Sequence, residues 1–435
     1  MRVALVNPAW HYDGSVYFGC RHEHLPLELG YTAALLEKDG HETLMVDGQL
    51  QNLDNGALAE TVAVFGPDMT VVTTAPTYLF WRCAPPELRV PAEFLAELRG
   101  RGGLTVAVGP HGSATPGAAL AKLGTDVVVR GECEEVVAAL ARAIGDRGDW
   151  RSLPGTARLE AGRVVVNGAP AASPFVDHGP LRWPTEWIAN HRHHHHRFDG
   201  AGRGYGAEVE ASRGCPYDCS FCAKIDYRDK YRRRSLDHVL AEIDGLISQG
   251  VGYVYFVDEI FLPQKPLLEA LVDRRVEFGV QTRIDLWKPD LLELLGRAGC
   301  VSIEAGIESL TVEGRAALAK RCKLSTDELA DLLVKARRHV PFVQANLIGM
   351  EEDEADLVRS WRERLIAAGV WANEPVPLYP YPSSPTYRQL WGEPDDRAWE
   401  RAHEHYLTAF DRFSDIQDAR PLPLAALEDA CCKGH

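Results

Sequence analysis

Short apolar runs alternate with longer segments of helical periodicity over the first 150 residues. This alternation is typical of a parallel sheet covered by helices. The apolar runs predict strands at 2–6, 42–46, 69–74, 104–108 and 126–129. The periodic segments predict helices at 27–39, 50–63, 92–99, 114–122 and 134–144. The pattern therefore predicts an α/β domain over residues 1–150.

The same alternation restarts near residue 204 and continues to about residue 387. Strands are expected at 208–211, 253–257, 277–282, 300–305, 342–348 and 374–379. Helices are expected at 236–248, 265–274, 290–298, 311–319, 326–338 and 353–368. Six strand–helix units make an incomplete (β/α)6 barrel of the TIM type, whose chemistry would gather at the carboxyl ends of the strands. An open barrel of this kind leaves room for a sizeable substrate.

Two further segments lie outside these repeats. Residues 151–203 form a connector with a small hairpin at 155–168 and a histidine-rich tract at 191–198. Such tracts can bind metal, but a surface or interface loop is the favoured interpretation. Residues 388–435 are helical and rich in Trp, His, Asp and Arg, and we expect them to close the barrel edge or cover the substrate.

Length and charge narrow the class of protein. A chain of 435 residues exceeds one compact core, so two or three domains are expected. The formal net charge of −15 argues against nucleic acid as a partner and is compatible with a cationic small-molecule substrate. No apolar run is long enough to span a bilayer, and the N-terminus does not read as a signal peptide. We therefore expect a cytoplasmic protein with no membrane partner, where clustered cysteines indicate metal more than disulfides.

Three cysteines are clustered in one short polar stretch, residues 212–222. Cys215, Cys219 and Cys222 are spaced C-x3-C-x2-C, so one tight loop can aim three sulfurs at a single inorganic centre. Structural zinc normally takes four protein ligands, and Pro216 and Asp218 make a buried run of free thiols a poor alternative. Three thiolates are one fewer than an ordinary [4Fe–4S] cluster takes, which leaves one iron open to a substrate.

This spacing, with the aromatic Phe221 just before the last cysteine, resembles the signature of the radical SAM superfamily. The resemblance implies a [4Fe–4S] cluster on Cys215, Cys219 and Cys222, whose open iron chelates S-adenosylmethionine (SAM). It also implies an external electron donor such as flavodoxin or ferredoxin. One electron would split SAM into methionine and a 5′-deoxyadenosyl radical. Phe221 would pack beside the adenosine.

Polar residues follow successive strands of the predicted barrel, where SAM needs partners for its charged groups and its ribose. The resemblance places the SAM amino group near Asp258 and Glu259, and the methionyl carboxylate at Arg283. The ribose would lie at the fourth strand, with Glu304 preferred to Glu308. Each carboxylate alone is equally well a helix cap or a surface ion pair, but their joint placement favours a site. The remaining cofactor contacts are expected from Gln281, Asn346 and Ile348.

The first domain lacks a G-x-G-x-x-G turn after its first strand, which argues against a dinucleotide. Its layout resembles the Rossmann-like cobalamin-binding domain found upstream of many radical SAM domains. The resemblance suggests cofactor contacts at the strand ends, from Thr73, Gly109, Pro110 and His111. The D-x-H-x-x-G motif of one cobalamin-binding type is absent, and the bulky run at 78–81 would fill the slot for the nucleotide tail. These residues leave open whether cobalamin is bound.

The segments at 17–28 and 78–83, with the His-Arg-Phe run, resemble a subgroup that includes diol-dehydratases of aminoglycoside antibiotic biosynthesis. The resemblance implies hydrogen abstraction from a carbinol carbon of an amino sugar, followed by loss of a neighbouring hydroxyl. Hydroxide departure needs a general acid within hydrogen-bond reach. Cobalamin-dependent methyl transfer is the alternative reaction, and a sensor without turnover is the alternative from another class. Candidates for proton transfer are Asp258, Glu308, Glu374 and Tyr217.

Overall fold

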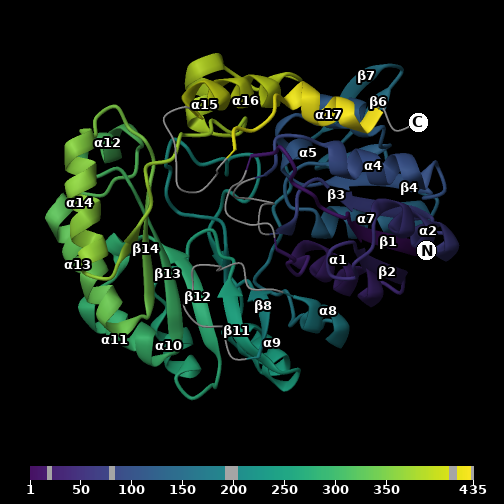
Figure 1. The fold of residues 1–435 in the computed structure, drawn as a ribbon. Helices are drawn as coiled ribbons and strands as arrows, with labels where there is room; N and C mark the ends of the chain where they lie inside the picture. The colour runs from purple at the N-terminus through teal and green to yellow at the C-terminus, as the bar shows by residue number, and fades with distance from the viewer. Residues whose placement is uncertain (17–21, 78–83, 192–203, 411–418, 433–435) are drawn as a thin grey trace.

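Two sheets lie side by side in the computed structural model, which describes residues 1–16, 22–77, 84–191, 204–410 and 419–432. Figure 1 shows the N-terminal half in purple and blue and the second half in teal and green. The first sheet has strand order β2-β1-β3-β4-β5-β6-β7, and the second has order β15-β14-β13-β12-β11-β8. Residues 17–21, 78–83 and 192–203 fall outside the described residues. They include the start of the segment noted at 17–28, the bulky run at 78–81 and most of the histidine-rich tract at 191–198.

The five expected N-terminal strands form the parallel part of the first sheet. These are β1 (Arg2–Asn7), β2 (Glu42–Asp47), β3 (Met69–Thr73), β4 (Leu104–Val108) and β5 (Val127–Val129). The helices are α1 (Leu27–Lys38), α2 (Asn55–Phe65), α4 (Arg89–Leu98), α5 (Pro110–Ala114), α6 (Pro116–Leu123) and α7 (Glu134–Gly145). The expected helix at 114–122 starts instead at Pro116, and α5 precedes it. Each begins with a proline, whose missing N–H is harmless in a first turn.

The hairpin expected at 155–168 is present, and it extends the first sheet. Its strands are β6 (Thr156–Glu160) and β7 (Arg163–Asn167), and β6 pairs antiparallel with β5. The sheet therefore continues past residue 150, where the domain boundary was expected. A short helix, α8 (Thr185–Asn190), follows the hairpin.

The second sheet is parallel throughout, as the expected barrel requires. Its strands are β8 (Tyr205–Val209), β11 (Val251–Phe256), β12 (Glu277–Thr282), β13 (Cys300–Glu308), β14 (Phe342–Leu347) and β15 (Trp371–Ala372). The helices between them are α9 (Leu236–Ser248), α10 (Lys265–Leu271), α11 (Pro289–Arg297), α12 (Val312–Ala317), α13 (Thr326–His339) and α14 (Ala355–Ala367). Local side-chain hydrogen bonds fix the start of some of these helices. Helix α13, for example, begins with a capping box formed by Ser325 and Glu328.

The last expected strand, at 374–379, is wrong. The sixth strand is the two-residue β15, and after it only a single bridge joins Ile348 to Val376. Pro375 and Pro377 flank that bridge and have no N–H to donate, so a longer ladder cannot form there. The segment is instead free to run along the mouth of the barrel.

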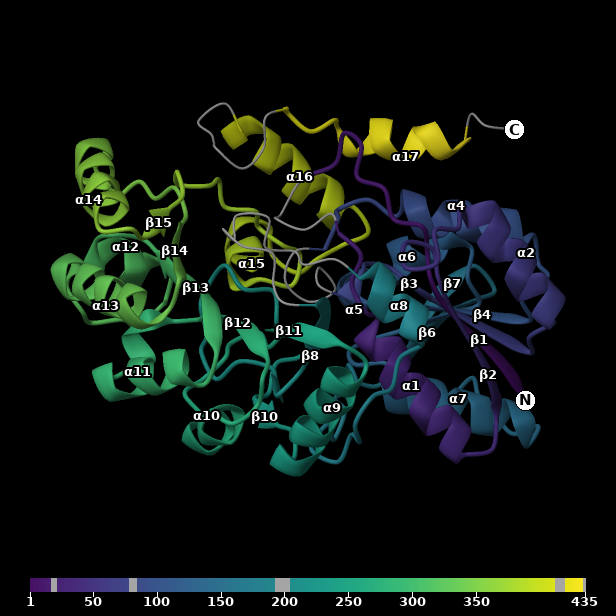
Figure 2. The same cartoon turned by 60° about the horizontal axis from the view of Figure 1, so that its bottom comes forward.

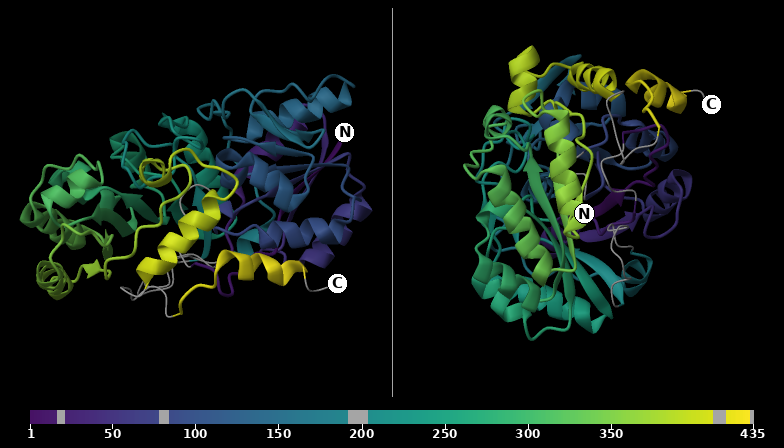
Figure 3. Two further views of the ribbon diagram at one scale, coloured as in Figure 1. Left: turned by 90° about the horizontal axis from the view of Figure 1, so that it is seen from above. Right: turned by 60° about the vertical axis from the view of Figure 1, so that its left-hand side comes forward.

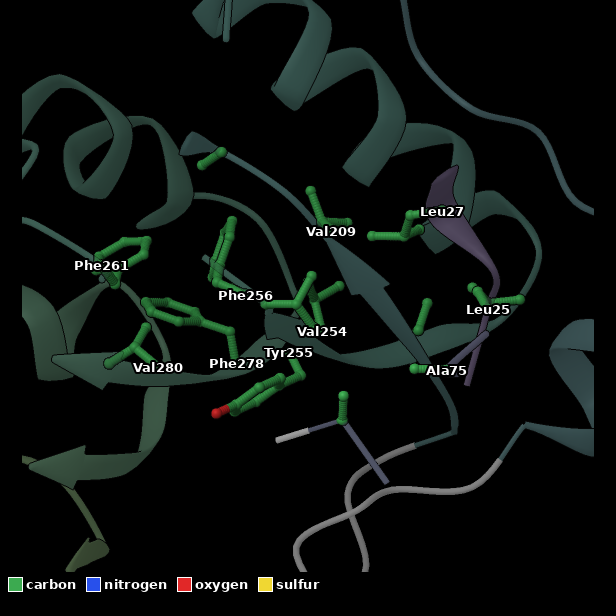
Figure 4. Packing of buried hydrophobic residues seen from close by; sticks show 14 of the residues in the cluster. Leu25, Leu27, Ala75, Val209, Val254, Tyr255, Phe256, Phe261, Phe278 and Val280 are labelled. Atoms are coloured by element: carbon green, nitrogen blue, oxygen red, sulfur yellow. The ribbon is translucent and has the colours of Figure 1, made fainter. Parts of the chain in front are cut away.

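The two halves share one apolar core. Leu25 and Leu27 from the N-terminal half lie beside Val209 of β8 and Val254 of β11, with Ala75 close by (Figure 4). All five side chains are fully buried or nearly so. Fully burying a leucine or valine contributes about 1.5–3 kcal/mol, so this contact holds the halves together as one body.

The C-terminal helices cross from one half to the other, as expected for a helical extension. They are α15 (Pro385–Trp391), α16 (Ala398–Ala409) and α17 (Leu424–Cys432). Figure 3 shows them in yellow, spanning the barrel half and the N-terminal half. Within the described residues, no helix combines the length and the apolar character that crossing a bilayer requires.

Candidate active site

A cavity of about 300 Å³ opens at the carboxyl ends of the barrel strands. Its walls come from the cysteine loop, from the ends of β11, β12 and β13, and from residues 376–381 that follow β15. A cavity of this size can enclose a small organic ligand. The placement agrees with the barrel rule that chemistry gathers at the carboxyl ends of the strands.

All three clustered cysteines line this cavity. Their loop lies between two short paired strands, β9 (Ser212–Arg213) and β10 (Arg232–Arg233). It begins at Gly214, which has φ +79° and where a Cβ would lie 2.2 Å from the carbonyl oxygen of Lys230. Only glycine therefore allows the loop to turn so tightly toward the strand ends.

Burial raises the pKa of Cys215 to about 11 and raises the pKa of Cys222 further. Without a nearby metal, these thiols would therefore be protonated at neutral pH. Iron would deprotonate them on binding, because metal ligation requires thiolates. A [4Fe–4S] cluster takes each thiolate on a different iron, so three cysteines around one cavity mouth fit it. Among the described side chains, no three His, Cys, Asp or Glu are placed to hold a single metal ion.

The loop is also held by Lys224, whose Nζ donates to the carbonyl of Cys215 at 2.9 Å. The same ammonium pairs with Asp229 at 3.0 Å and with Asp218 at 3.5 Å. The backbone N–H of Ser220 donates to Leu318, which ties the loop to the end of α12. These contacts pre-organise the cysteine positions.

Several of the expected SAM contacts lie in the same cavity wall. The guanidinium of Arg283 lies 4.2 Å from the ring centroid of Tyr217 and pairs with Asp285 at 2.8 Å. Its Nη1 is buried and has no hydrogen-bond partner among the described groups, so it is suited to an anionic ligand. The Oε1 atom of Gln281 is likewise buried without a partner. The other predicted residues in the wall are Phe221, Glu259 and Ile348.

The structure brings Glu308, and not Glu304, into the cavity wall. Glu308 has φ +69°, an uncommon value for a residue with a side chain, and the pairing of β13 with β14 shifts register beside it. Such backbone strain is typical of functional sites. The Oε1 atom of Glu308 accepts from Nζ of Lys320 at 3.1 Å. The preference for Glu304 is therefore not supported by the geometry.

Lys320 is a cavity residue that the sequence did not indicate. Its side chain is only 4% exposed, yet it lines the cavity together with the cysteine loop. It follows α12, more than ten residues after the end of β13, in a stretch with no motif. Only the return of the chain from α12 places it beside Glu308.

Two other predicted residues lie outside the cavity wall. The carboxylate of Asp258 is fully buried and accepts from the backbone N–H of Ala211 at 2.8 Å and from the hydroxyl of Ser212. It thus joins the end of β11 to the start of the cysteine loop. The amide oxygen of Asn346 accepts from Gln344 at 2.6 Å. Roles for these residues in SAM binding or proton transfer stay predictions.

Replacing Asp258 with asparagine is expected to make stability less dependent on pH. Burial raises the pKa of Asp258 from 3.8 to about 8, so the folded protein keeps a proton that the unfolded chain releases. The free energy of unfolding therefore falls as pH rises from about 4 to about 8, by up to about 1.4 kcal/mol per pH unit. Asparagine can still accept from the N–H of Ala211 through its amide oxygen and can donate its NH2 to the hydroxyl of Ser212, but it does not titrate. Urea unfolding at about pH 5 and about pH 8 measures how the free energy of unfolding of each protein changes with pH. The same change with pH in both proteins would contradict the prediction.

The predicted residues of the first domain lie at the carboxyl end of its sheet, away from the cysteines. The hydroxyl of Thr73 donates to Asn7 at 3.0 Å. Gly109 and Pro110 start α5 directly after β4. His111 is completely buried, and burial together with the charge of Lys122 lowers its pKa to about 3. None of the four lines the cysteine cavity.

Comparison with known proteins agrees with this arrangement. Residues 209–361 match the Radical SAM superfamily. The anaerobic magnesium-protoporphyrin IX monomethyl ester cyclase of Cereibacter sphaeroides is 28% identical over 326 residues, which cover 71% of this chain and 50% of that protein. The enzyme of the same name from Rubrivivax gelatinosus is 26% identical, over 90% of this chain and 70% of its own length. The chain thus spans about half of the first of these relatives.

Two solved structures share the fold. The radical SAM methyltransferase TsrM from Kitasatospora setae, with cobalamin and a [4Fe–4S] cluster bound, matches with a TM-score of 0.71 and 21% identity, over 88% of this chain and 76% of that chain. The cobalamin-dependent SAM radical enzyme OxsB, with aqua-cobalamin bound, matches with a TM-score of 0.66 and 15% identity, over 99% of this chain and 60% of that chain.

Most of the cavity wall lies within residues 209–361, so this segment is a radical SAM domain whose three cysteines are placed for the predicted [4Fe–4S] cluster and SAM. The architecture of the chain, a Rossmann-like domain followed by a partial barrel, is shared with solved structures of cobalamin-dependent radical SAM enzymes. The radical SAM domain and the fold predicted from the sequence are therefore confirmed.

Proposed function

We propose that the enzyme abstracts a hydrogen atom from a small hydroxylated substrate, an amino sugar or aminoglycoside, and that a neighbouring hydroxyl then leaves as water. The observation that carries this proposal is the Lys320–Glu308 pair in the wall of the SAM cavity. A buried ammonium beside a carboxylate offers a proton donor and a proton acceptor within one small space.

The residues of the cavity divide naturally between the cofactors and the substrate. Cys215, Cys219 and Cys222 would hold the cluster, and Arg283, with its unpaired Nη1, would hold the SAM carboxylate. When bound, the reduced cluster cleaves SAM and supplies a 5′-deoxyadenosyl radical. Tyr217 would position Arg283 through their stacked contact. Glu308 and Lys320 are then left for the substrate.

The proposed reaction removes one molecule of water and consumes two electrons. Hydrogen-atom abstraction leaves a radical at a carbinol carbon. Lys320 gives a proton to the neighbouring hydroxyl as its C–O bond breaks, and Glu308 accepts the proton of the remaining carbinol. Water leaves, and the resulting α-keto radical takes one electron and one proton, with an external one-electron donor as the reductant. Each turnover then uses one SAM and two electrons, and yields a deoxy ketone.

Cobalamin-dependent methyl transfer is the second candidate. It is favoured by the matched solved structures, of which TsrM is a methyltransferase, and by a match to the hopanoid C-3 methylase of Methylococcus capsulatus. The two candidate reactions can be distinguished by the products that the reconstituted enzyme forms from SAM, a reductant and a set of amino sugars. Dehydration yields 5′-deoxyadenosine and a product lighter by one water without added cobalamin. A methylated product that forms only with methylcobalamin would overturn the proposal.

Replacing Lys320 with methionine is expected to separate radical formation from product formation. The variant keeps the length of the side chain but cannot donate a proton. Dehydrated product should fall by about 10²- to 10⁴-fold, whereas reductive formation of 5′-deoxyadenosine continues. Lys323→Met is the matched control, because Lys323 is exposed and three residues away. A parallel loss of 5′-deoxyadenosine would show instead that Lys320 acts through SAM binding.

A further inference from the structure

A cofactor shared by both domains would have to bind in the space between the two sheets. Ligands of open parallel sheets bind at the carboxyl ends of the strands. A corrin bound to the first domain would have to lie between those strand ends and the SAM cavity to reach the substrate. Figure 2 shows α15 and α16 in this region, between the barrel half and α5 of the N-terminal half.

Three buried aromatic rings bridge this space. His111 of α5, directly after β4, stacks on Trp399 of α16 with ring centroids 4.3 Å apart and planes inclined by 26°. Trp399 also contacts Tyr381, with ring centroids 6.0 Å apart in a T-shaped arrangement. Tyr381 itself lines the SAM cavity. The column His111–Trp399–Tyr381 therefore runs from the first sheet to the wall of the radical site, and none of the three residues is more than 8% exposed.

Helix α16 is fixed in place by polar contacts with the first domain. The indole N–H of Trp399 donates to the hydroxyl of Thr115 at 3.1 Å. Lys122 of α6 pairs with Glu400 of α16 at 2.7 Å and with Glu428 of α17 at 2.9 Å. Asp396, just before α16, lies so close to α6 that a Cβ at Gly117 would be 2.5 Å from its carboxylate. The helix is thus packed against the sheet end and is not a loose cover.

The crevice between β1 and β3, where the strand order of the first sheet reverses, is also closed by internal contacts. The amide oxygen of Asn7 accepts from the indole N–H of Trp10 at 2.7 Å and from Thr73 at 3.0 Å. The amide nitrogen of Asn7 donates to Asp47 at 2.6 Å. All four side chains are buried. These four polar groups at the crevice are therefore paired with each other, although the hydroxyl of Thr74, directly after β3, has no hydrogen-bond partner among the described groups.

We propose that Trp399, which contacts both His111 and Tyr381, takes up the space that a corrin needs between the two domains, so that this enzyme works without cobalamin. The first domain then serves as a wall that carries α16 and, through Tyr381, one side of the SAM cavity. The inference rests on the proposed function in one respect, which is that the reaction uses SAM without a second cofactor. Corrin binding itself can be measured without any substrate.

The test is corrin retention by the full-length, cluster-reconstituted enzyme. The protein is incubated anaerobically with hydroxocobalamin and with methylcobalamin, desalted, and measured for corrin absorbance and iron. We expect full iron content with corrin below about one tenth of an equivalent, and no corrin-dependent rise in Tm. A corrin present at about 100 times its dissociation constant would raise the Tm measurably. Near-stoichiometric retention, or such a rise in Tm, would overturn the inference.

Two variants test whether Trp399 itself excludes the corrin. Trp399→Ala removes the middle ring of the column, and Trp391→Ala removes a tryptophan of the neighbouring α15 that packs on Tyr387 and His405 instead. If Trp399 fills the space of the corrin, corrin retention should rise in Trp399→Ala and not in Trp391→Ala, which would support the inference. Equal corrin retention in both variants would overturn it. If the enzyme forms the dehydrated product but also binds corrin, this inference alone is overturned. If the corrin-free enzyme forms no dehydrated product, the proposed reaction alone is overturned.

Discussion

Replacing Cys222 with alanine is expected to lower the formation of 5′-deoxyadenosine by more than about 100-fold, because even changes outside the ligand shell cost about 10- to 100-fold in metal centres. Cys222 lines the cavity with Cys215 and Cys219, so its loss leaves only two thiolates for the cluster. Two ligands cannot hold a [4Fe–4S] cluster in the orientation that leaves one iron open to SAM. Iron content, the visible absorbance of the cluster and 5′-deoxyadenosine should therefore fall together.

The matched control is Cys322→Ala. Cys322 is a free and nearly buried cysteine of the same half, but it does not line the cavity. We expect iron content and 5′-deoxyadenosine near those of the unchanged enzyme. A Cys222→Ala protein that keeps a full cluster and its SAM cleavage would refute the ligand assignment. Equal losses in both variants would instead indicate a general effect on folding.

Replacing Arg213 with methionine is expected to lower the free energy of unfolding by about 3–5 kcal/mol, the cost of breaking a buried ion pair from one side. Arg213 has no exposed surface and donates to Glu134 of α7 and to Glu210, each at 2.7 Å. Its guanidinium also lies 4.3 Å from the ring centroid of Phe175. Methionine fills much of the volume but leaves these carboxylates buried with less compensating charge.

Arg213 is one of the arginines whose charges keep the buried carboxylate of Glu210 ionised. Burial raises the pKa of Glu210, but the charges of Arg213 and Arg228 outweigh that effect and hold the pKa at about 2. Arg228 continues the network to Glu28 of α1 at 3.1 Å. The network thus joins the first domain to the start of the cysteine loop, because Arg213 directly precedes Gly214 and Cys215. Looser cluster binding should accompany the loss of stability.

Arg359→Met serves as the control for Arg213→Met. Arg359 is largely exposed and pairs with Asp356 one turn away on α14. Exposed pairs of this kind contribute little, so the expected change is within about 0.5 kcal/mol. Chemical denaturation of both variants, followed by circular dichroism, measures the difference. Similar small changes in the two proteins would show that the buried network does not stabilise the fold.

The candidate site was predictable to the extent that its signals are local. The three cysteines lie within eight residues, so their spacing alone indicated a shared centre. Arg283 directly follows β12 and Glu259 lies shortly after the end of β11, and parallel strands bring their carboxyl ends to one edge. The choice between Glu304 and Glu308 was not predictable, because it depends on a left-handed backbone at Glu308 and a register shift beside it.

Contacts between distant segments carried no such signal. Lys320 reaches Glu308 only through the return of the chain from α12, and 288 residues separate His111 from Trp399 along the sequence. Nothing in the composition of the C-terminal segment distinguishes a helix that covers substrate from one that fills the space between domains. The expected strand at 374–379 failed for a local reason, since two prolines interrupt its hydrogen bonding.

By itself, the sequence determined that this protein has two sets of parallel strands covered by helices, a cysteine loop suited to a three-ligand cluster, and polar groups at successive strand ends. Periodicity and short spacing encode these features, because they depend on neighbours along the chain. The tertiary structure alone decided which carboxylate faces the cavity, which lysine pairs with it, and what lies between the two domains. Those outcomes depend on the packing of segments far apart in sequence, where the burial of a ring such as Trp399 outweighs any local preference.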